Sequence, residues 1–382
     1  MTTASACGVL DRFLDAAVSR GLAPAVVAGV VGPERELFLS AAGARDVAAG
    51  APLTPDAIFR IASMTKPITS LAAMLLVEDG AIDLDAPASR YLPELERLRV
   101  LVGYDDRDGT WSGRPPSRPI TLRHLLTHTS GMSYPFLDPR LARIDTGSIA
   151  RADIPLVHDP GERFTYSYAT AVVGAIVAAV SGRSLDDFCR ARIFDPLGMR
   201  DTAYAAPAER RDRVVTMQVH EGGAFVERPN PTVIESRGRG DDGLFSTAAD
   251  YGKFIQLFLN LGEVVGRRVA GEATIRAMMS NQLGPMPIGL QPAAPGAIAT
   301  AFPIGGDKDG FGFGFQIETA PRRAEGRSPG SCSWSGIWNT YFWIDPVERI
   351  GATVLMQFMP AHDAGALEIL STVEQIVYDE FV

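Results

Sequence analysis

The segment Ser63-Met-Thr-Lys66 carries the strongest chemical signal in the sequence. A serine hydroxyl is a weak nucleophile and needs a base within hydrogen-bond reach. At positions i and i+3 of a first helical turn, Ser63 and Lys66 share one face, and the helix N-terminus favours negative charge that develops there. Pro67 supports a helix that begins at Ser63, because the first helical N–H groups have no intrahelical partner. The pattern predicts nucleophilic catalysis; its structural alternative is an N-capping serine beside a solvated lysine.

Two further segments hold side chains of the right type to complete such a site. Phe164-Thr-Tyr166-Ser-Tyr168 comes directly before an alanine-rich helical segment, so a tyrosine hydroxyl there lies at the mouth of a helix. Ser333-Trp334-Ser335-Gly336 opens an aromatic strand that ends at Asp345. Each has a simple structural explanation, a core tyrosine or a core tryptophan, and only the combination with the Ser63 segment indicates a site.

In these residues the chain resembles the superfamily of serine β-lactamases and penicillin-binding proteins, and within it the class C-related esterases called family VIII carboxylesterases. The similarity runs along nearly the whole chain, in the order expected for the family. Beyond Ser63-Met-Thr-Lys66, it is carried by Ile120-Thr-Leu-Arg-His-Leu-Leu-Thr-His128-Thr-Ser-Gly131, Phe194-Asp-Pro-Leu-Gly-Met199, Gly243-Leu-Phe-Ser-Thr-Ala-Ala-Asp250 and Gly312-Phe-Gly314-Phe.

The resemblance implies a role for each site residue. Ser63 becomes the acylated nucleophile, while Lys66 and Tyr166 share the proton transfers, and the choice of base between them stays open. The backbone N–H groups of Ser63 and Ile337 form the implied oxyanion hole. The residues implied to line the substrate site are Trp334, Ser335, Gly336 and Tyr168. His128 matches a framework position of the family.

Two departures from the family pattern guide the expected substrate. β-Lactamases and transpeptidases usually carry a Lys-Thr-Gly strand motif, whose cation helps to hold a substrate carboxylate, and Trp334 stands in that place here. Their second motif usually ends in Asn, which binds the substrate amide, and this chain has Tyr168. We therefore expect hydrolysis of neutral esters with short to medium acyl groups. Acyl transfer, weak β-lactamase or D-Ala-D-Ala peptidase activity, and a non-catalytic scaffold are the alternatives.

Three other motif matches are weaker. Gly238-Arg-Gly240-Asp-Asp-Gly243 fits a dinucleotide-binding pattern by letter, but it brings carboxylates where a pyrophosphate must approach, so a flexible turn is expected. His124 and His128 have zincin spacing, yet Leu125 stands where the catalytic Glu is required. Ser328 lies in a Gly-x-Ser-x-Gly pattern, but the following Pro329 has no N–H to donate to an oxyanion.

Composition excludes several classes of protein. The 382 residues carry 45 acidic and 36 basic side chains, a net charge of −9, which disfavours a nucleic-acid partner. The three scattered cysteines suggest neither a disulfide framework nor a metal knuckle, and no motif requires a metal or an organic cofactor. The sequence shows no signal-peptide pattern and no uninterrupted apolar stretch of about 18 residues. We expect a cytoplasmic protein with a small-molecule ester substrate and no membrane contact.

The apolar patterning predicts strands and a helix at both chain ends and a mostly helical middle. We expect an α/β fold in the loose sense: residues 1–80 and 301–382 form an antiparallel sheet flanked by helices, and residues 81–300 form an inserted helical domain. A Thr247-to-Asp250 capping box begins one middle helix. Expected helices are Leu10–Arg20, Ser63–Glu78, Leu122–Thr127, Ala169–Val180, Thr247–Leu261 and Gly365–Phe381; expected strands are Ala25–Val31, Leu37–Ala41, Ile58–Ile61, Phe311–Ile317, Ser331–Ile344 and Ile350–Phe358.

Overall fold

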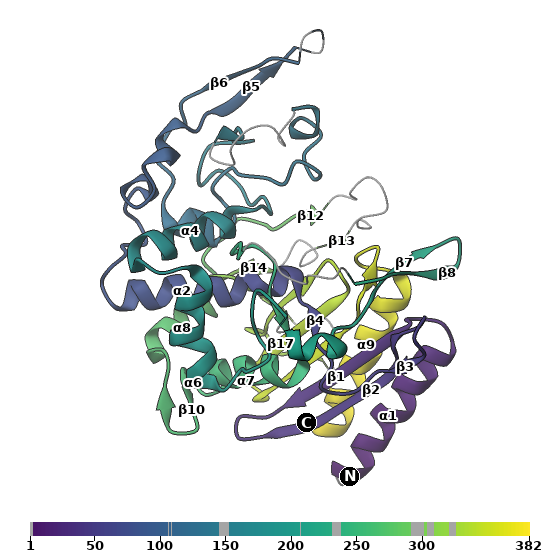
Figure 1. Ribbon diagram of the computed structural model, residues 1–382. Coiled ribbons are helices and arrows are strands. Elements are labelled where there is room, and N and C mark those ends of the chain that lie inside the picture. Colours follow the sequence, from purple (N-terminus) through teal and green to yellow (C-terminus); the bar gives the residue numbers. More distant parts are fainter. Residues whose placement is uncertain are drawn as a thin grey trace.

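An antiparallel sheet of eight strands, assembled from both ends of the chain, forms the frame of the fold (Figure 1). The computed structural model describes residues 3–105, 107, 109–144, 153–206, 208–230, 238–291, 302–303, 309–320 and 326–382. In spatial order the strands are β14 (Gly310–Phe311), β15 (Gln316–Ile317), β16 (Cys332–Gly336), β17 (Thr340–Asp345), β18 (Ile350–Leu355), β1 (Ala25–Val31), β2 (Glu36–Asp46) and β3 (Ala51–Pro52).

The two chain ends meet where β1 pairs with β18, with Val27 opposite Leu355. Every residue of both strands is buried, because layers of helix cover both faces of the sheet at this point. This burial explains why Ala25–Val31 is an uninterrupted apolar run and not an alternating one. The sequence-based expectation of an antiparallel sheet flanked by helices is therefore confirmed.

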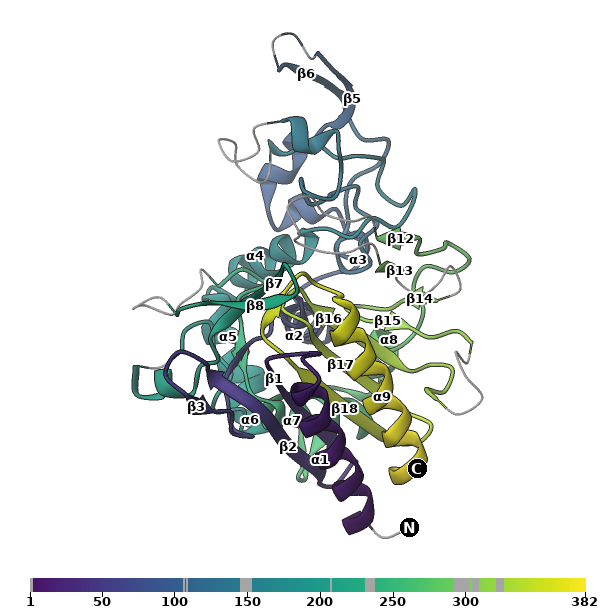
Figure 2. The same ribbon diagram turned by 90° about the vertical axis from the view of Figure 1, so that its right-hand side faces the viewer.

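Helices from opposite chain ends share one face of the sheet. α1 (Thr3–Ser19) and α9 (Ala364–Phe381) lie side by side, and their apolar stripes pack with the strands into one hydrophobic cluster (Figure 2). The other face is covered by α7 (Ala248–Leu259), which contacts β1, β17 and β18. α7 comes from the middle of the chain, so residues from the expected insertion also pack on the sheet. The division at residues 81 and 301 stays a prediction.

The rest of the described chain forms short helices and two- or three-stranded ribbons around this frame. The remaining helices are α2 (Thr65–Glu78), α3 (Leu122–Leu126), α4 (Ala169–Ser181), α5 (Leu185–Cys189), α6 (Asp195–Leu197) and α8 (Glu272–Met278). The ribbons pair β4 (Phe59–Arg60) with β9 (Phe245–Ser246), β5 (Val100–Tyr104) with β6 (Trp111–Arg114), β7 (Met217–Glu221) with β8 (Ala224–Arg228) and β19 (Phe358–Met359), β10 (Glu263–Val264) with β11 (Arg267–Arg268), and β12 (Leu290–Gln291) with β13 (Phe302–Pro303).

The structure differs from the expected strand Ser331–Ile344, because a tight turn divides this run into β16 and β17. Asn339 closes the turn at a φ of 59°, a left-handed conformation that asparagine tolerates better than most residues. The apolar pattern continues through both strands, so it does not reveal the reversal. The expected strand Phe311–Ile317 is likewise a hairpin of β14 and β15, turned at Gly314 with a φ of 97°.

The capping box expected at the start of α7 forms only in part. The Thr247 hydroxyl accepts from the Asp250 N–H at 3.1 Å, as expected for an N-cap. The Asp250 carboxylate instead accepts from the Asp201 N–H at 2.7 Å and from Lys253 at 2.8 Å. The carboxylate of Asp250 thus bonds to a backbone N–H from outside the helix and to the charged amine of Lys253, three residues further along α7.

A buried ion-pair cluster joins α9 to the edge of the sheet and gives a test of the fold. Arg327 donates to Glu318 at 3.2 Å and to Glu374 at 2.7 Å, and its side chain is 7% exposed. We expect Arg327→Met to lower the free energy of unfolding by about 3–5 kcal/mol, because it leaves two buried carboxylates uncompensated. Urea unfolding of both variants gives the measurement. The control, Arg20→Met, removes an exposed ion pair with Glu368, which also lies on α9. It should lower the free energy of unfolding by less than about 1 kcal/mol.

Candidate active site

Ser63 lies in a short 3₁₀ turn, Ala62–Met64, between β4 and α2. The helix itself begins at Thr65, two residues later than the sequence predicts. Ala62, directly before the serine, has a φ of 44°, which costs an alanine roughly 1–2 kcal/mol. Such strain in a non-glycine residue is typical of functional sites, where the surrounding packing holds an unfavourable backbone in place.

The structure brings the three side chains of the predicted catalytic group together. Lys66 Nζ lies 3.0 Å from Ser63 Oγ, and the Tyr166 hydroxyl lies 2.8 Å from the same oxygen. Lys66 follows from the helical i, i+3 spacing, whereas Tyr166 arrives from the segment before α4. These distances are those of direct hydrogen bonds, so a proton can pass between Ser63 and either neighbour.

Lys66 is buried, with 1% of its surface exposed. Its Nζ also lies 3.1 Å from the Tyr134 hydroxyl and 2.8 Å from the Asp241 carbonyl oxygen. Tyr134 in turn donates to the Asp241 carboxylate at 2.8 Å. Burial and the nearby Asp241 charge raise the pKa of Tyr134 well above its ordinary value, so its hydroxyl stays neutral. Together with Ser63, these groups satisfy the buried amine.

Tyr134 and Asp241 are site residues that the sequence reasoning missed. Asp241 belongs to the Gly238-to-Gly243 segment, which was expected to be a flexible turn; the structure shows a turn there, and Asp241 within it is buried. A Cβ atom at Gly240 would lie 2.5 Å from the Thr170 carbonyl oxygen and 2.7 Å from the Thr69 side chain. The glycine therefore lets the segment fit tightly between α2 and α4, and Asp241 is fully buried. No local signal singles out Tyr134.

Aromatic rings form the wall beside the Ser63 hydroxyl. The Trp334 ring lies 5.1 Å from Tyr166 and 5.4 Å from Phe311, measured between centroids. Phe136 stacks on Tyr134 at 4.9 Å. Trp334 and its neighbour Gly336 are buried, while Ser335 is partly exposed. Of the predicted substrate-binding residues of this strand, Trp334 thus lies beside Tyr166.

Tyr168 takes a different position from the one that a substrate-binding role requires. Its side chain is only 2% exposed and packs edge-on against Tyr134, with ring centroids 6.2 Å apart. The structure therefore gives Tyr168 little surface for direct contact with a substrate. It supports the ring of Tyr134 from behind.

A glycine, Gly336, allows strand β16 to pack closely against the backbone just before Ser63. A Cβ atom at Gly336 would lie 2.5 Å from the Ile61 carbonyl oxygen and 3.3 Å from Ala62 Cβ. Strand β16 therefore ends directly against the turn that carries Ser63, and Ile337 is the next residue of the chain. The oxyanion hole formed by the N–H groups of Ser63 and Ile337 stays a prediction, and this close approach of the two segments is compatible with it.

His128 lies behind the site and is 1% exposed. Its Nδ1 lies 3.2 Å from Ser167 Oγ, and its ring packs against Tyr166 at 5.0 Å. His124 caps its own helix by accepting from the Thr121 N–H. Within the described part of the chain, no group of three or more His, Cys, Asp or Glu side chains could hold a metal ion.

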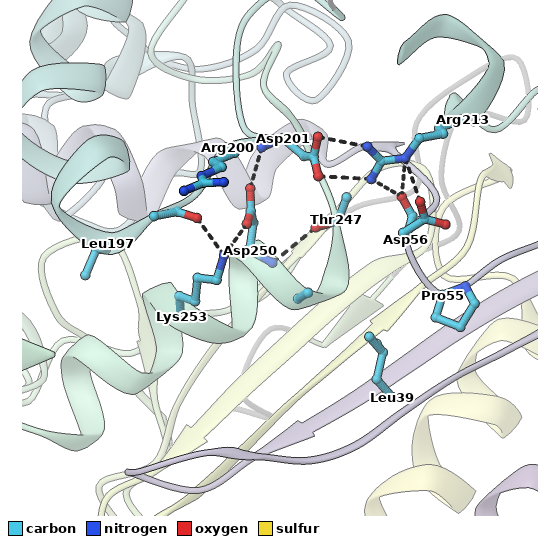
Figure 3. A pocket seen from close by; sticks show the side chains of 12 residues that line it. Leu39, Pro55, Asp56, Leu197, Arg200, Asp201, Arg213, Thr247, Asp250 and Lys253 are labelled. Atoms are coloured by element: carbon cyan, nitrogen blue, oxygen red, sulfur yellow. Dashed lines mark hydrogen bonds and ion pairs between the residues drawn. The ribbon is translucent and has the colours of Figure 1, made fainter. Parts of the chain in front are cut away.

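A separate pocket of about 670 Å³ opens near the N-terminus of α7, and none of the predicted site residues lines it (Figure 3). Several of its charges pair with one another: Arg213 bridges Asp201 at 2.9 Å, and Lys253 bridges Asp250 at 2.8 Å. The Asp250 carboxylate also accepts from the Asp201 N–H, which ties α7 to the segment after α6.

Among the described helices, none is by itself both long and apolar enough to cross a membrane. One bent pair, α4 with the segment Leu185–Leu197 at 78°, meets the criteria of length and composition only.

The comparisons with known proteins agree with this fold. A model of the Beta-lactamase family matches residues 10–373. Protein Rv1367c of Mycobacterium tuberculosis is 33% identical over 360 residues, covering 89% of this chain and 87% of its own. Lovastatin esterase of Penicillium rubens is 33% identical over 320 residues, covering 78% and 77%. The LovD6 mutant of Simvastatin Synthase from Aspergillus terreus superposes with a TM-score of 0.84 at 27% identity, covering 98% of this chain and 95% of that one.

Fold and similarity together define a serine hydrolase of the β-lactamase and transpeptidase type. The chain belongs to the Beta-lactamase family. The family has esterase and acyltransferase members, so both ester cleavage and acyl transfer are within its chemistry.

The buried His128 predicts a pH dependence of stability. Burial lowers the pKa of His128 well below its ordinary value of 6.5, so the folded protein keeps the ring neutral. Below pH 6.5 the unfolded chain gains a proton that the folded chain does not, and stability falls as the pH falls. Between pH 7.5 and 5.5, wild type should lose about 1.4 kcal/mol more than His128→Gln. Urea unfolding at both pH values measures this difference, and equal losses would contradict it.

Proposed function

We propose that the protein is a carboxylesterase of the family VIII type, which cleaves esters of short to medium acyl groups through an acyl-enzyme on Ser63. One observation carries the proposal: Ser63 Oγ has both Lys66 Nζ, at 3.0 Å, and the Tyr166 hydroxyl, at 2.8 Å, within hydrogen-bond reach. A serine needs such neighbours to lose its proton as it attacks.

In the first half of the reaction, Ser63 Oγ attacks the ester carbonyl carbon while its proton moves to Lys66 or Tyr166. The N–H groups of Ser63 and Ile337 stabilise the negative carbonyl oxygen of the tetrahedral intermediate. When this intermediate collapses, the bond to the alcohol oxygen breaks and the alcohol leaves with a proton from the same pair. The acyl group remains on Ser63.

In the second half, a water molecule replaces the alcohol. Lys66 or Tyr166 accepts its proton, the hydroxide oxygen attacks the acyl carbon, and Ser63 recovers its proton as the carboxylic acid leaves. The contacts do not distinguish the two bases, since both reach the same oxygen.

The aromatic wall supports a neutral, apolar substrate. Trp334 packs against Tyr166 and Phe311 in the place where related enzymes carry a lysine that holds a substrate carboxylate. An indole offers apolar contact and no positive charge, so an ester gains more than an anionic β-lactam from it. The similarity to lovastatin esterase supports the same choice.

Acyl transfer is the second candidate, and the likeness to Simvastatin Synthase favours it. The first half of the reaction is then unchanged, and an alcohol of the acceptor takes the position of water in the second half. The two activities differ only in which nucleophile reaches the acyl-enzyme.

The proposal predicts Ser63-dependent ester turnover. With p-nitrophenyl acetate, butyrate and octanoate, we expect wild type to release nitrophenol and Ser63→Ala to lose more than about a thousandfold in kcat/KM. Tyr166→Phe should also lose activity, because it removes one of the two proton-transfer neighbours. Nitrocefin should be cleaved much more slowly than the esters.

Arg20→Met serves as the control variant, since Arg20 lies on the opposite face of the sheet in an exposed ion pair. Normal ester turnover by Ser63→Ala would sink the proposal. Faster cleavage of nitrocefin than of esters would replace it with β-lactamase activity. Adding an alcohol acceptor and analysing the products separates hydrolysis from acyl transfer.

A further inference from the structure

The hydrogen bonds around Tyr134 run in one direction only. A tyrosine hydroxyl has a single hydrogen to donate, and an ionised carboxylate can only accept. Tyr134 gives its hydrogen to Asp241 Oδ2 at 2.8 Å, so its oxygen is left as an acceptor toward Lys66 Nζ at 3.1 Å. The Asp241 carboxylate thereby determines which atom donates in the hydrogen bond between Tyr134 and Lys66, although the carboxylate is not part of that bond.

The backbone of Asp241 determines the direction of a second hydrogen bond to Lys66. The Asp241 carbonyl oxygen can only accept, and it lies 2.8 Å from Lys66 Nζ. A neutral lysine amine has two N–H donors and one lone pair. When Tyr134 and the Asp241 carbonyl occupy both donors, the lone pair is left facing Ser63 Oγ, 3.0 Å away.

We propose that the Tyr134–Asp241 pair is a positioning device that turns the lone pair of Lys66 toward the Ser63 hydroxyl. The inference rests on the proposed Ser63 chemistry, and of the two candidate bases it assigns the Ser63 proton to a neutral Lys66. It adds two residues to that chemistry. Both residues contact Lys66 Nζ, and they act on Ser63 through it.

The arrangement also suits the state after proton transfer. When Ser63 Oγ forms its bond to the acyl carbon, its proton passes to Lys66, and the amine becomes an ammonium with three N–H donors. Two of them keep their acceptors, Tyr134 and the Asp241 carbonyl, and the third points back at the Ser63 oxygen. No partner has to move during the transfer, which is the condition for a preorganised site.

Without the carboxylate, the same hydroxyl would interfere. Free of Asp241, Tyr134 could rotate its hydrogen toward Lys66 and occupy the lone pair that Ser63 needs. An amide at position 241 permits this rotation, because its NH₂ can donate to the Tyr134 oxygen. Asp241→Asn therefore keeps the size and the backbone carbonyl, and it allows the contact to reverse. It also removes the carboxylate charge, which faces Arg239 at 3.6 Å.

The test measures how fast a fluorophosphonate labels Ser63 in the full-length protein. In this reaction the serine oxygen bonds to phosphorus, fluoride leaves, and Lys66 takes the proton, so labelling reports activation of Ser63 whatever the natural substrate is. We expect Tyr134→Phe and Asp241→Asn each to lower the second-order labelling rate constant about 10- to 100-fold.

A double mutant shows whether the two residues act as one unit. With Phe at position 134 there is no hydroxyl to reorient, so adding Asp241→Asn should slow labelling by less than about threefold more. In ester turnover, Tyr134→Phe should lower kcat and leave KM within about threefold, since the ring and its stack on Phe136 remain.

Tyr378→Phe is the matched control, because Tyr378 makes the same kind of bond to the Asp345 carboxylate at 2.9 Å from α9. It should label at the wild-type rate, and thermal melting of all variants checks that they fold. If wild-type Ser63 is not labelled, the proposed function fails and the inference falls with it. Two results with a labelled wild type would overturn the inference alone. One is a wild-type labelling rate constant for Tyr134→Phe. The other is a double mutant whose loss in rate equals the product of the two single losses.

Discussion

The burial of the Lys66 amine is the constraint on which the site depends. Lys66 is 1% exposed, and a buried amine is stable only when hydrogen-bond partners are supplied to it. Three parts of the chain supply them: Ser63 from the same helical turn, Tyr134 from the loop after α3, and Asp241 from the segment before β9.

The sheet makes this convergence possible by joining the two ends of the chain. Pairing of β1 with β18 holds the N-terminal half, with Ser63, against the C-terminal strands. Two glycines then let these layers approach closely. Gly336, at the end of β16, packs against the backbone just before Ser63, and Gly314 packs against Ser70 and Pro67 on α2. A side chain at either glycine would displace backbone that carries the site, which connects the packing of the frame directly to the chemistry.

The relatives include an esterase and an acyltransferase. In the reaction proposed for this chain, the two activities share one intermediate, the acyl-enzyme on Ser63. The proposal therefore leaves the choice between water and an alcohol to whatever binds beside the aromatic wall of Trp334, Tyr166 and Phe311. The same catalytic group can therefore serve several reactions within one fold.

The sequence by itself determined what depends on local backbone geometry. The i, i+3 spacing of Ser63 and Lys66 and the apolar runs of β1 and β18 follow from the periods of helix and strand. The tertiary structure decided the rest: the reversal at Asn339, the burial of Tyr168, and the meeting of Tyr134 with Asp241 at Lys66. These contacts join residues up to 175 positions apart, and they depend on how whole layers pack, which no local pattern encodes.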